Sequence, residues 1–143
     1  LHASYYAGCA FTKSYVGYVH AVAHSLGGAY NVPHGLANAV LLPLVLEAYG
    51  PRIHKKLHRL AVEVGLADRQ DSPAVGARRF IEAIEDMKQR FSIGTSIPQL
   101  QKADIPHLAR LADKEANPLY PVPVLKDAGE LEEFYRLILP KEE

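Results

Sequence analysis

The feature that most constrains how this 143-residue chain folds is the stretch from Ser14 to Leu46, which contains no aspartate, glutamate, lysine or arginine. A helix that faces solvent carries charged side chains along one side, so a helical segment this apolar must be largely buried. Helical periodicity dominates the whole chain, and no run alternates convincingly at period two. The sequence therefore predicts an all-α helical bundle.

Seven helices are predicted from periodicity and from residues that begin or end helices. They cover residues 2–11, 14–26, 33–49, 51–65, 73–91, 105–112 and 130–138. The second is expected to stop at Gly27-Gly28, because glycine adopts the left-handed conformation found at helix ends. Pro43 is expected to bend the third helix, because its ring removes one backbone hydrogen bond. The inward face of the fourth helix is expected to comprise Ile53, Leu57, Leu60 and Val64.

Composition narrows the class of function. The 16 basic and 16 acidic residues give zero net charge, so no basic face for nucleic acid is expected. No apolar run reaches the roughly 18 residues that span a bilayer, so no membrane partner is expected. Cys9 is the only cysteine, which excludes an internal disulfide and fits a reducing cytoplasm. Because the chain starts at Leu1 rather than methionine, we expect it to be part of a longer protein.

The uncharged stretch contains three histidines, His20, His24 and His34. His20 and His24 are four residues apart and share one helical face, and His34 follows a glycine-containing turn that can return to that face. Neutral imidazole is the commonest metal ligand in proteins, so the three rings predict a metal site. Spacing suggests His20 and His24 as the chelating pair but leaves open which rings bind. Gly17, expected inside this helix at a cost of about 1 kcal/mol, indicates that a neighbouring helix or a ligand approaches the face closely.

A second pair with the same spacing, His54 and His58, lies among lysines and an arginine. A cation site surrounded by cations is unfavourable, so both rings are expected to be exposed to solvent. His2 and His107 are expected to be exposed as well.

The segment GYVHAVAHSLGGAYNVPHGLANAVLLP, residues 17–43, resembles the signature of the iron-dependent alcohol dehydrogenases. That signature is approximately G-x-x-H-x-x-x-H-x-L-G, a short turn, P-H-G-x-x-N-A and then L-P, and every fixed position is matched here. The resemblance extends upstream through ASYYAGCAF and downstream to DIPHLARLADKEANP, so it covers nearly the whole chain. Many members carry arginine where this chain has Leu119, which loosens the subfamily assignment.

The resemblance implies a two-domain protein with an N-terminal α/β nucleotide-binding domain and a C-terminal all-α domain. Residues 1–143 correspond to the C-terminal domain. It further implies one metal ion, Fe²⁺ or Zn²⁺, held by an aspartate and three histidines, of which the last two ligands carry over to His20 and His34. The other two ligands would lie upstream of Leu1. His24 would face the nicotinamide and the substrate and assist proton transfer. The resemblance therefore assigns His20 and His34 as ligands, in place of the His20–His24 pair that the spacing suggested.

The function implied by the resemblance is the interconversion of a primary alcohol and its aldehyde, with NAD or NADP as cofactor. The expected partners are the alcohol or aldehyde, the protein's own nucleotide-binding domain and further copies of the chain, in the cytoplasm. Without that domain, the chain is expected to be inactive. Two alternatives belong to other classes. One is a stand-alone tri-histidine zinc hydrolase, for which no general base lies between Ser14 and Leu46; the other is a non-catalytic helical interaction module with core histidines.

Overall fold

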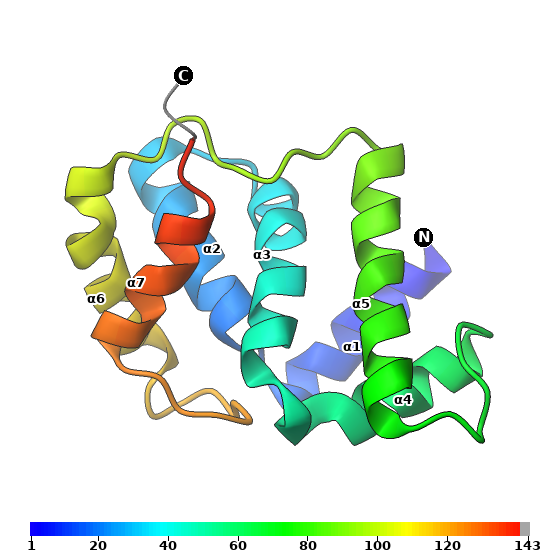
Figure 1. The fold of residues 1–143 in the computed structure, drawn as a ribbon. Helices are drawn as coiled ribbons and strands as arrows, with labels where there is room; N and C mark the ends of the chain where they lie inside the picture. Colours follow the sequence, from blue (N-terminus) through cyan, green and yellow to red (C-terminus); the bar gives the residue numbers. More distant parts are fainter. Residues whose placement is uncertain (141–143) are drawn as a thin grey trace.

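The computed structural model describes residues 1–140 and consists of helices joined by loops, without β-strands in that range (Figure 1). The elements are α1 (His2–Ser14), α2 (Tyr18–Tyr30), α3 (His34–Tyr49), α4 (Pro51–Glu63), α5 (Pro73–Arg90), the short 3₁₀-helix η1 (Lys102–Asp104), α6 (Ile105–Ala116) and α7 (Ala128–Leu137). The predicted all-α fold is confirmed. The last three residues of the predicted domain, 141–143, lie outside the described residues.

The core lies where α2 and α3 meet and where α6 and α7 pack against them. Figure 1 shows α6 and α7 on one side of α3 and α5 on the other, with α4 packed against α5. This double coverage is why α3 can be apolar around much of its circumference. Fully buried side chains include Tyr18, Leu26, Leu41 and Tyr135. Burial of one such aliphatic side chain contributes about 1.5–3 kcal/mol.

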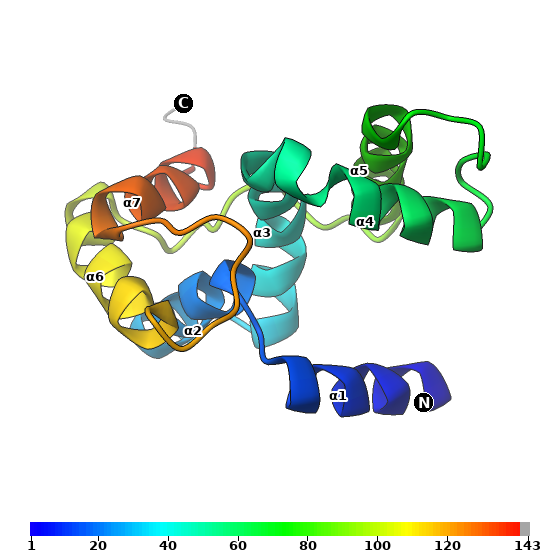
Figure 2. The same ribbon diagram turned by 90° about the horizontal axis from the view of Figure 1, so that it is seen from below.

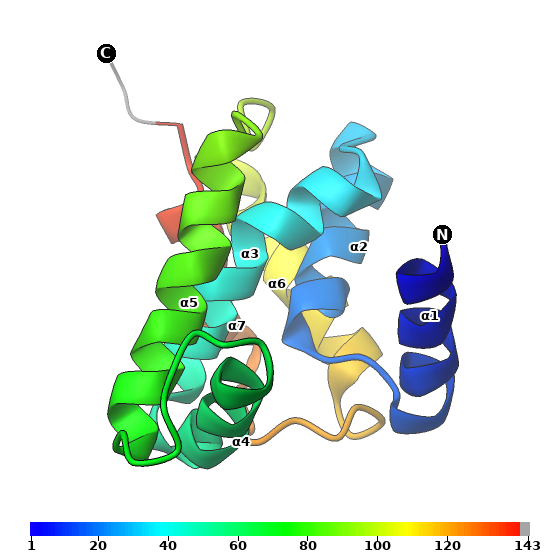
Figure 3. The ribbon, with the colours of Figure 1, turned by 90° about the vertical axis from the view of Figure 1, so that its right-hand side faces the viewer.

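The helix α1 stands apart from the rest of the molecule (Figures 2 and 3). None of its residues is buried, and Tyr5, Tyr6 and Phe11 are exposed. It extends to Ser14, three residues beyond the predicted end. No helix of residues 1–140 has both the length and the apolar character that crossing a membrane requires.

Both predicted ends of the second helix were wrong. Helix α2 begins at Tyr18 and continues through Gly27 and Gly28 to Tyr30. Glycine costs only about 1 kcal/mol inside a helix, which the packing of α2 in the core outweighs. The left-handed residue is Asn31 (φ 55°, ψ 33°), whose N–H donates to the Gly27 carbonyl. Asparagine is among the few non-glycine residues that tolerate this conformation.

The interpretation of Gly17 was also wrong, because α2 begins one residue after it. Gly17 is not inside a helix but precedes the first residue of α2, with an extended backbone (φ −145°). A Cβ built there would lie 3.6 Å from Tyr49 Oη and 3.7 Å from Val122 Cγ1, which is ordinary van der Waals contact. No unusually close approach explains this glycine.

The inward face of α4 is narrower than predicted. Ile53 and Leu57 are buried as expected, but Leu60 is 48% exposed and Val64 62% exposed. The fully buried Ala61 continues the face instead. Residues 53, 57 and 61 follow one another at spacing four, so they form a single line along the helix against α5. Helix α3 runs unbroken through Pro43, which is buried.

The prediction that His54 and His58 are exposed was wrong, because α4 packs tightly on α5. His58 is half-buried, and its buried Nδ1 atom has no hydrogen-bond partner. A Cβ built on Gly76 of α5 would lie only 2.1 Å from that Nδ1 atom. His54 is also half-buried and lines a cavity of about 570 Å³ between α3, α4 and α5. His2 and His107 are exposed, as predicted.

Candidate metal centre

The structure brings together the rings of His20 and His24 of α2 and His34 of α3. The ring centroids are 5.3 Å apart for His20 and His34, 5.1 Å for His24 and His34, and 5.9 Å for His20 and His24. His20 is half-buried, whereas His24 and His34 are exposed. The three residues that the sequence singled out therefore form one cluster.

The short connection between α2 and α3 makes this cluster possible. Only residues 31–33 separate the helices, and the left-handed Asn31 reverses the chain direction. Pro33, with φ −55°, immediately precedes α3, so His34 is the first residue of that helix. The His34 ring at this position lies beside the rings that α2 carries at His20 and His24.

The spacing of His20 and His34 fits two ligands of one ion. A metal–nitrogen bond of 2.0–2.1 Å puts an imidazole centre about 3.2 Å from the ion, so two rings at a tetrahedral angle lie about 5.2 Å apart. The observed separation is 5.3 Å, with an angle of 52° between the ring planes. His24 and His34 have a similar separation, but their planes differ by only 22° and the rings stack. Lone pairs lie in the ring plane, so stacked rings do not direct them to a common point.

Among residues 1–140, no group of three or more histidine, cysteine, aspartate and glutamate side chains is arranged to hold a metal ion. Which rings bind an ion is not tested by these distances, and the assignment of His20 and His34 stays a prediction.

Asn38, one turn after His34, supplies a further polar contact. Its Nδ2 atom lies 2.8 Å from His34 Nε2, and its Oδ1 atom is buried without a hydrogen-bond partner. Buried polar atoms without partners are rare in packed cores. A buried oxygen without a partner, close to an exposed imidazole, is typical of a binding site whose ligand supplies the missing polar contact.

Electrostatics keep the His20 ring in the form that binds metal. Burial lowers the pKa of His20, repulsion from His34 and His24 lowers it further, and Glu115 partly opposes these effects. Only the neutral imidazole has a free lone pair for a metal.

Sequence reasoning missed Glu115 and Tyr120, which adjoin the cluster. Glu115 Oε1 lies 2.7 Å from His24 Nδ1, and the Tyr120 hydroxyl donates to the same oxygen, also at 2.7 Å. Burial, together with the Glu115 carboxylate, raises the pKa of Tyr120 to about 12. Glu115 is 91 residues from His24 in the chain, so no local spacing connects them. The only signal was its place in the KEANP segment of the family resemblance.

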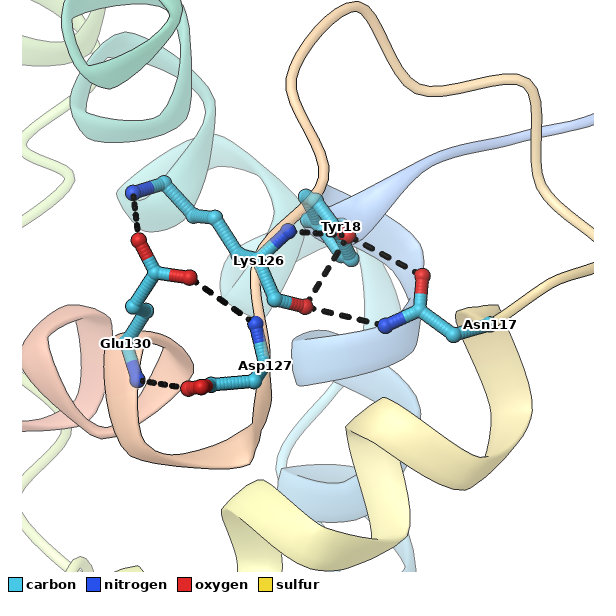
Figure 4. A network of polar contacts seen from close by, with 5 residues as sticks. All are labelled: Tyr18, Asn117, Lys126, Asp127 and Glu130. Carbon is cyan, nitrogen blue, oxygen red and sulfur yellow. Dashed lines mark hydrogen bonds and ion pairs between the residues drawn. The ribbon is translucent and has the colours of Figure 1, made fainter.

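A network of polar contacts holds the loop that carries Tyr120 (Figure 4). The Lys126 N–H donates to Tyr18 Oη at 2.9 Å, and the Tyr18 hydroxyl lies 3.1 Å from Asn117 Oδ1. Asn117 Nδ2 donates to the Lys126 carbonyl at 2.9 Å. Asp127 then begins α7 with a capping box that includes Glu130. Because Tyr18 is the first residue of α2, the network connects both ends of the loop to the helix that carries His20 and His24.

The fold and the histidine cluster define an all-α domain with a candidate metal site, and comparison with known proteins identifies the family. The profile of the "Fe-containing alcohol dehydrogenase family, C-terminal" matches residues 1–136, so the chain belongs to the iron-containing alcohol dehydrogenase family.

Individual relatives agree with this assignment. The chain is 39% identical over 122 residues to 1,3-propanediol dehydrogenase of Klebsiella pneumoniae, covering 81% of this chain and 30% of that protein. It is 42% identical over 91 residues to 1-propanol dehydrogenase PduQ of Salmonella typhimurium, covering 62% of this chain and 25% of that protein. The structure of an alcohol dehydrogenase from Oenococcus oeni superposes with a TM-score of 0.82 at 29% identity, over 92% of this chain and 35% of that one. The chain thus spans about a third or less of the length of these relatives.

Proposed function

We propose that residues 1–143 form the C-terminal domain of an NAD(P)-dependent enzyme that interconverts a small primary alcohol and its aldehyde, with His20 and His34 as two of the ligands of a divalent metal ion. The observation that carries this proposal is the 5.3 Å separation of these two rings, contributed by successive helices. The two curated relatives are named for 1,3-propanediol and 1-propanol, both primary alcohols.

The residues of this chain have distinct parts in the proposed reaction. When bound, an Fe²⁺ or Zn²⁺ ion supplies Lewis acidity and the nicotinamide accepts or returns a hydride. His20 and His34 would hold the ion in place. His24 takes the proton of the substrate hydroxyl at Nε2, because its Nδ1 atom already contacts Glu115.

A cavity beside His20 supports the choice of a small substrate. It has a volume of about 300 Å³ and is lined mainly by apolar atoms of α2 and α3, including those of Val19, Ala39 and Leu42. Apolar walls exclude water and leave room for a short alkyl chain while the polar end faces the rings.

The remaining ligands and the cofactor site would come from an α/β nucleotide-binding domain that precedes this chain. The exposed aromatic side chains Tyr5, Tyr6 and Phe11 of α1 support such a docking surface. We further propose that the longer protein forms homo-oligomers and works in the cytoplasm, with which the single cysteine, Cys9, is consistent.

Two alternatives are less well supported. An interaction module with core histidines conflicts with the exposure of His24 and His34. A tri-histidine hydrolase needs a general base, and Glu115 of α6 does supply a carboxylate near the cluster. However, Glu115 Oε1 already accepts from both His24 and Tyr120, which leaves it poorly placed to activate water.

Metal titration of the purified chain by calorimetry, with Fe²⁺ under anaerobic conditions and with Zn²⁺, tests the ligand assignment. We expect weak binding that is lost in His20→Ala and His34→Ala and retained in His107→Ala, an exposed histidine outside the cluster. Tight binding of one equivalent would favour the hydrolase, and binding unaffected by the two substitutions would refute the assignment.

NAD(P)-linked oxidation of 1-propanol tests the activity. We expect it in the longer protein that contains this chain, and we expect its loss in His20→Ala and His34→Ala with the circular dichroism spectrum retained. Turnover by the isolated chain would contradict the proposed need for a nucleotide-binding domain.

A further inference from the structure

We infer that Glu115 is a positioning residue for His24: its carboxylate holds the ring as the Nδ1–H tautomer and directs Nε2 to the substrate. The inference rests on the proposed function for its catalytic consequence, but its structural content stands on contacts within this chain.

The contact itself determines the tautomer. Glu115 Oε1 lies 2.7 Å from His24 Nδ1. An ionised carboxylate only accepts hydrogen bonds, so the hydrogen must be on Nδ1. Nε2 of the neutral ring is then unprotonated, and its lone pair is available to accept a proton.

The Glu115 carboxylate also accepts a second hydrogen bond. The Tyr120 hydroxyl donates to the same Oε1 atom at 2.7 Å. Because the pKa of Tyr120 is raised to about 12, this phenol stays protonated and remains a donor at every pH at which the enzyme would work. Two donors converging on one oxygen restrict the rotation of the Glu115 side chain.

The backbone segments that carry Glu115 and Tyr120 are held in place by contacts other than the one between Glu115 and His24. Glu115 lies in the last turn of α6, which packs on α2 and contains the buried residues Leu108 and Ala112. Tyr120 lies in the loop whose two ends are connected to Tyr18 by the network of Figure 4. The geometry therefore follows from the fold and not from an ion pair between two free side chains.

The pair is not expected to contribute much to stability. The side chains of His24 and Glu115 are 45% and 33% exposed, and ion pairs at such positions contribute little to the free energy of unfolding. What the contact supplies is orientation, as a carboxylate does for the catalytic histidine of serine proteases. In alcohol oxidation the O–H bond breaks, its electron pair stays on oxygen, and the proton forms a bond to Nε2. The imidazolium that results lies beside the Glu115 carboxylate, which keeps its own charge and takes up no proton.

Nuclear magnetic resonance of the 143-residue chain tests the structural part. Long-range ¹H–¹⁵N correlation spectra distinguish the two tautomers of His24 at a pH where the ring is neutral. We expect the Nδ1–H form in the wild type, a mixture in which the Nε2–H form is populated in Glu115→Ala, and an intermediate result in Glu115→Gln, whose amide oxygen still accepts. Glu133→Ala, at an exposed position of α7, is the matched control and should leave the spectrum unchanged. An Nε2–H tautomer in the wild type, or identical spectra in wild type and Glu115→Ala, would overturn the inference.

Steady-state kinetics of the longer protein test the consequence. We expect Glu115→Ala to lower kcat roughly 10- to 100-fold, a part of the effect of general acid–base catalysis, with little change in KM or metal content. Glu115→Gln should restore part of the rate, and thermal unfolding should be unchanged. A normal kcat in Glu115→Ala together with a reduced kcat in His24→Ala refutes the positioning role. A normal kcat in both variants instead refutes the proposed role of His24, while the tautomer measurement still decides the structural part.

Discussion

Replacing Gly76 by alanine should destabilise the chain, although the same substitution is favourable in most helices. Gly76 lies in the first turns of α5, where α5 packs closely against α4. A Cβ at this position would lie 2.1 Å from His58 Nδ1, 2.8 Å from His58 Cγ and 2.9 Å from His58 Cα. The imidazole can rotate away, but the Cα atom moves only if the helices separate.

The magnitude follows from two opposing effects. Overpacking of a helix contact typically costs about 1–3 kcal/mol, and a backbone clash belongs at the upper end of that range. Alanine gains about 1 kcal/mol over glycine in a helix interior. We therefore expect the free energy of unfolding to fall by about 1–2 kcal/mol, which corresponds to a decrease in Tm of roughly 3–7 °C for a domain of this size.

Thermal and urea denaturation followed by circular dichroism measures this effect. Gly28→Ala in α2 is the matched control, because nothing lies within 4 Å of a Cβ built there. The control should be unchanged or stabilised by up to about 1 kcal/mol. The stability of the double variant His58→Ala/Gly76→Ala should lie between those of Gly76→Ala and Gly28→Ala, because the double variant removes the contacts with the His58 ring but not the contact with Cα. Equal stability of Gly76→Ala and Gly28→Ala would refute the close packing of α4 and α5.

Three further predictions concern single side chains. Burial raises the pKa of Tyr49 to about 12, so the folded state favours the neutral phenol. This contribution to the free energy of unfolding should be fully present below about pH 10 and should be lost as the pH rises to 12. In Tyr49→Phe, urea unfolding measured across this pH range should show a smaller decrease in the free energy of unfolding. The pKa of His20 is lowered mainly by burial, so the unfolded state takes up its proton first as the pH falls below 6.5. The free energy of unfolding should therefore decrease with acidification, and less steeply in His20→Gln; an identical slope would contradict the assignment. The buried Tyr135 hydroxyl contacts Ser25 Oγ at 2.6 Å, so Tyr135→Phe should cost about 1–2 kcal/mol, whereas Tyr6→Phe, at an exposed position, should cost nothing measurable in the same melts.

The helices and the histidine cluster could be predicted from sequence because both depend on local order. The apolar stretch from Ser14 to Leu46 indicates burial wherever its helices pack, and the seven predicted helices correspond to α1–α7. Likewise, His20, His24 and His34 are close because a three-residue connection joins two helices, which is a short-range property of the chain.

Helix ends depend on a balance that local propensity alone does not decide. Gly27 and Gly28 would end an isolated helix, but core packing of α2 outweighs their cost and moves the end to Asn31. Leu60 was expected to be buried for its hydrophobicity, yet the smaller Ala61 occupies the line that faces α5.

By itself, then, the sequence determined the all-α class, the approximate helices and the residues of the histidine cluster. Tertiary structure alone decided that His58 is pressed against Gly76 and that Glu115 contacts His24. The physical reason is distance along the chain. Periodicity and turn chemistry act over a few residues, whereas these two contacts join helices whose relative position is determined only when the whole core packs.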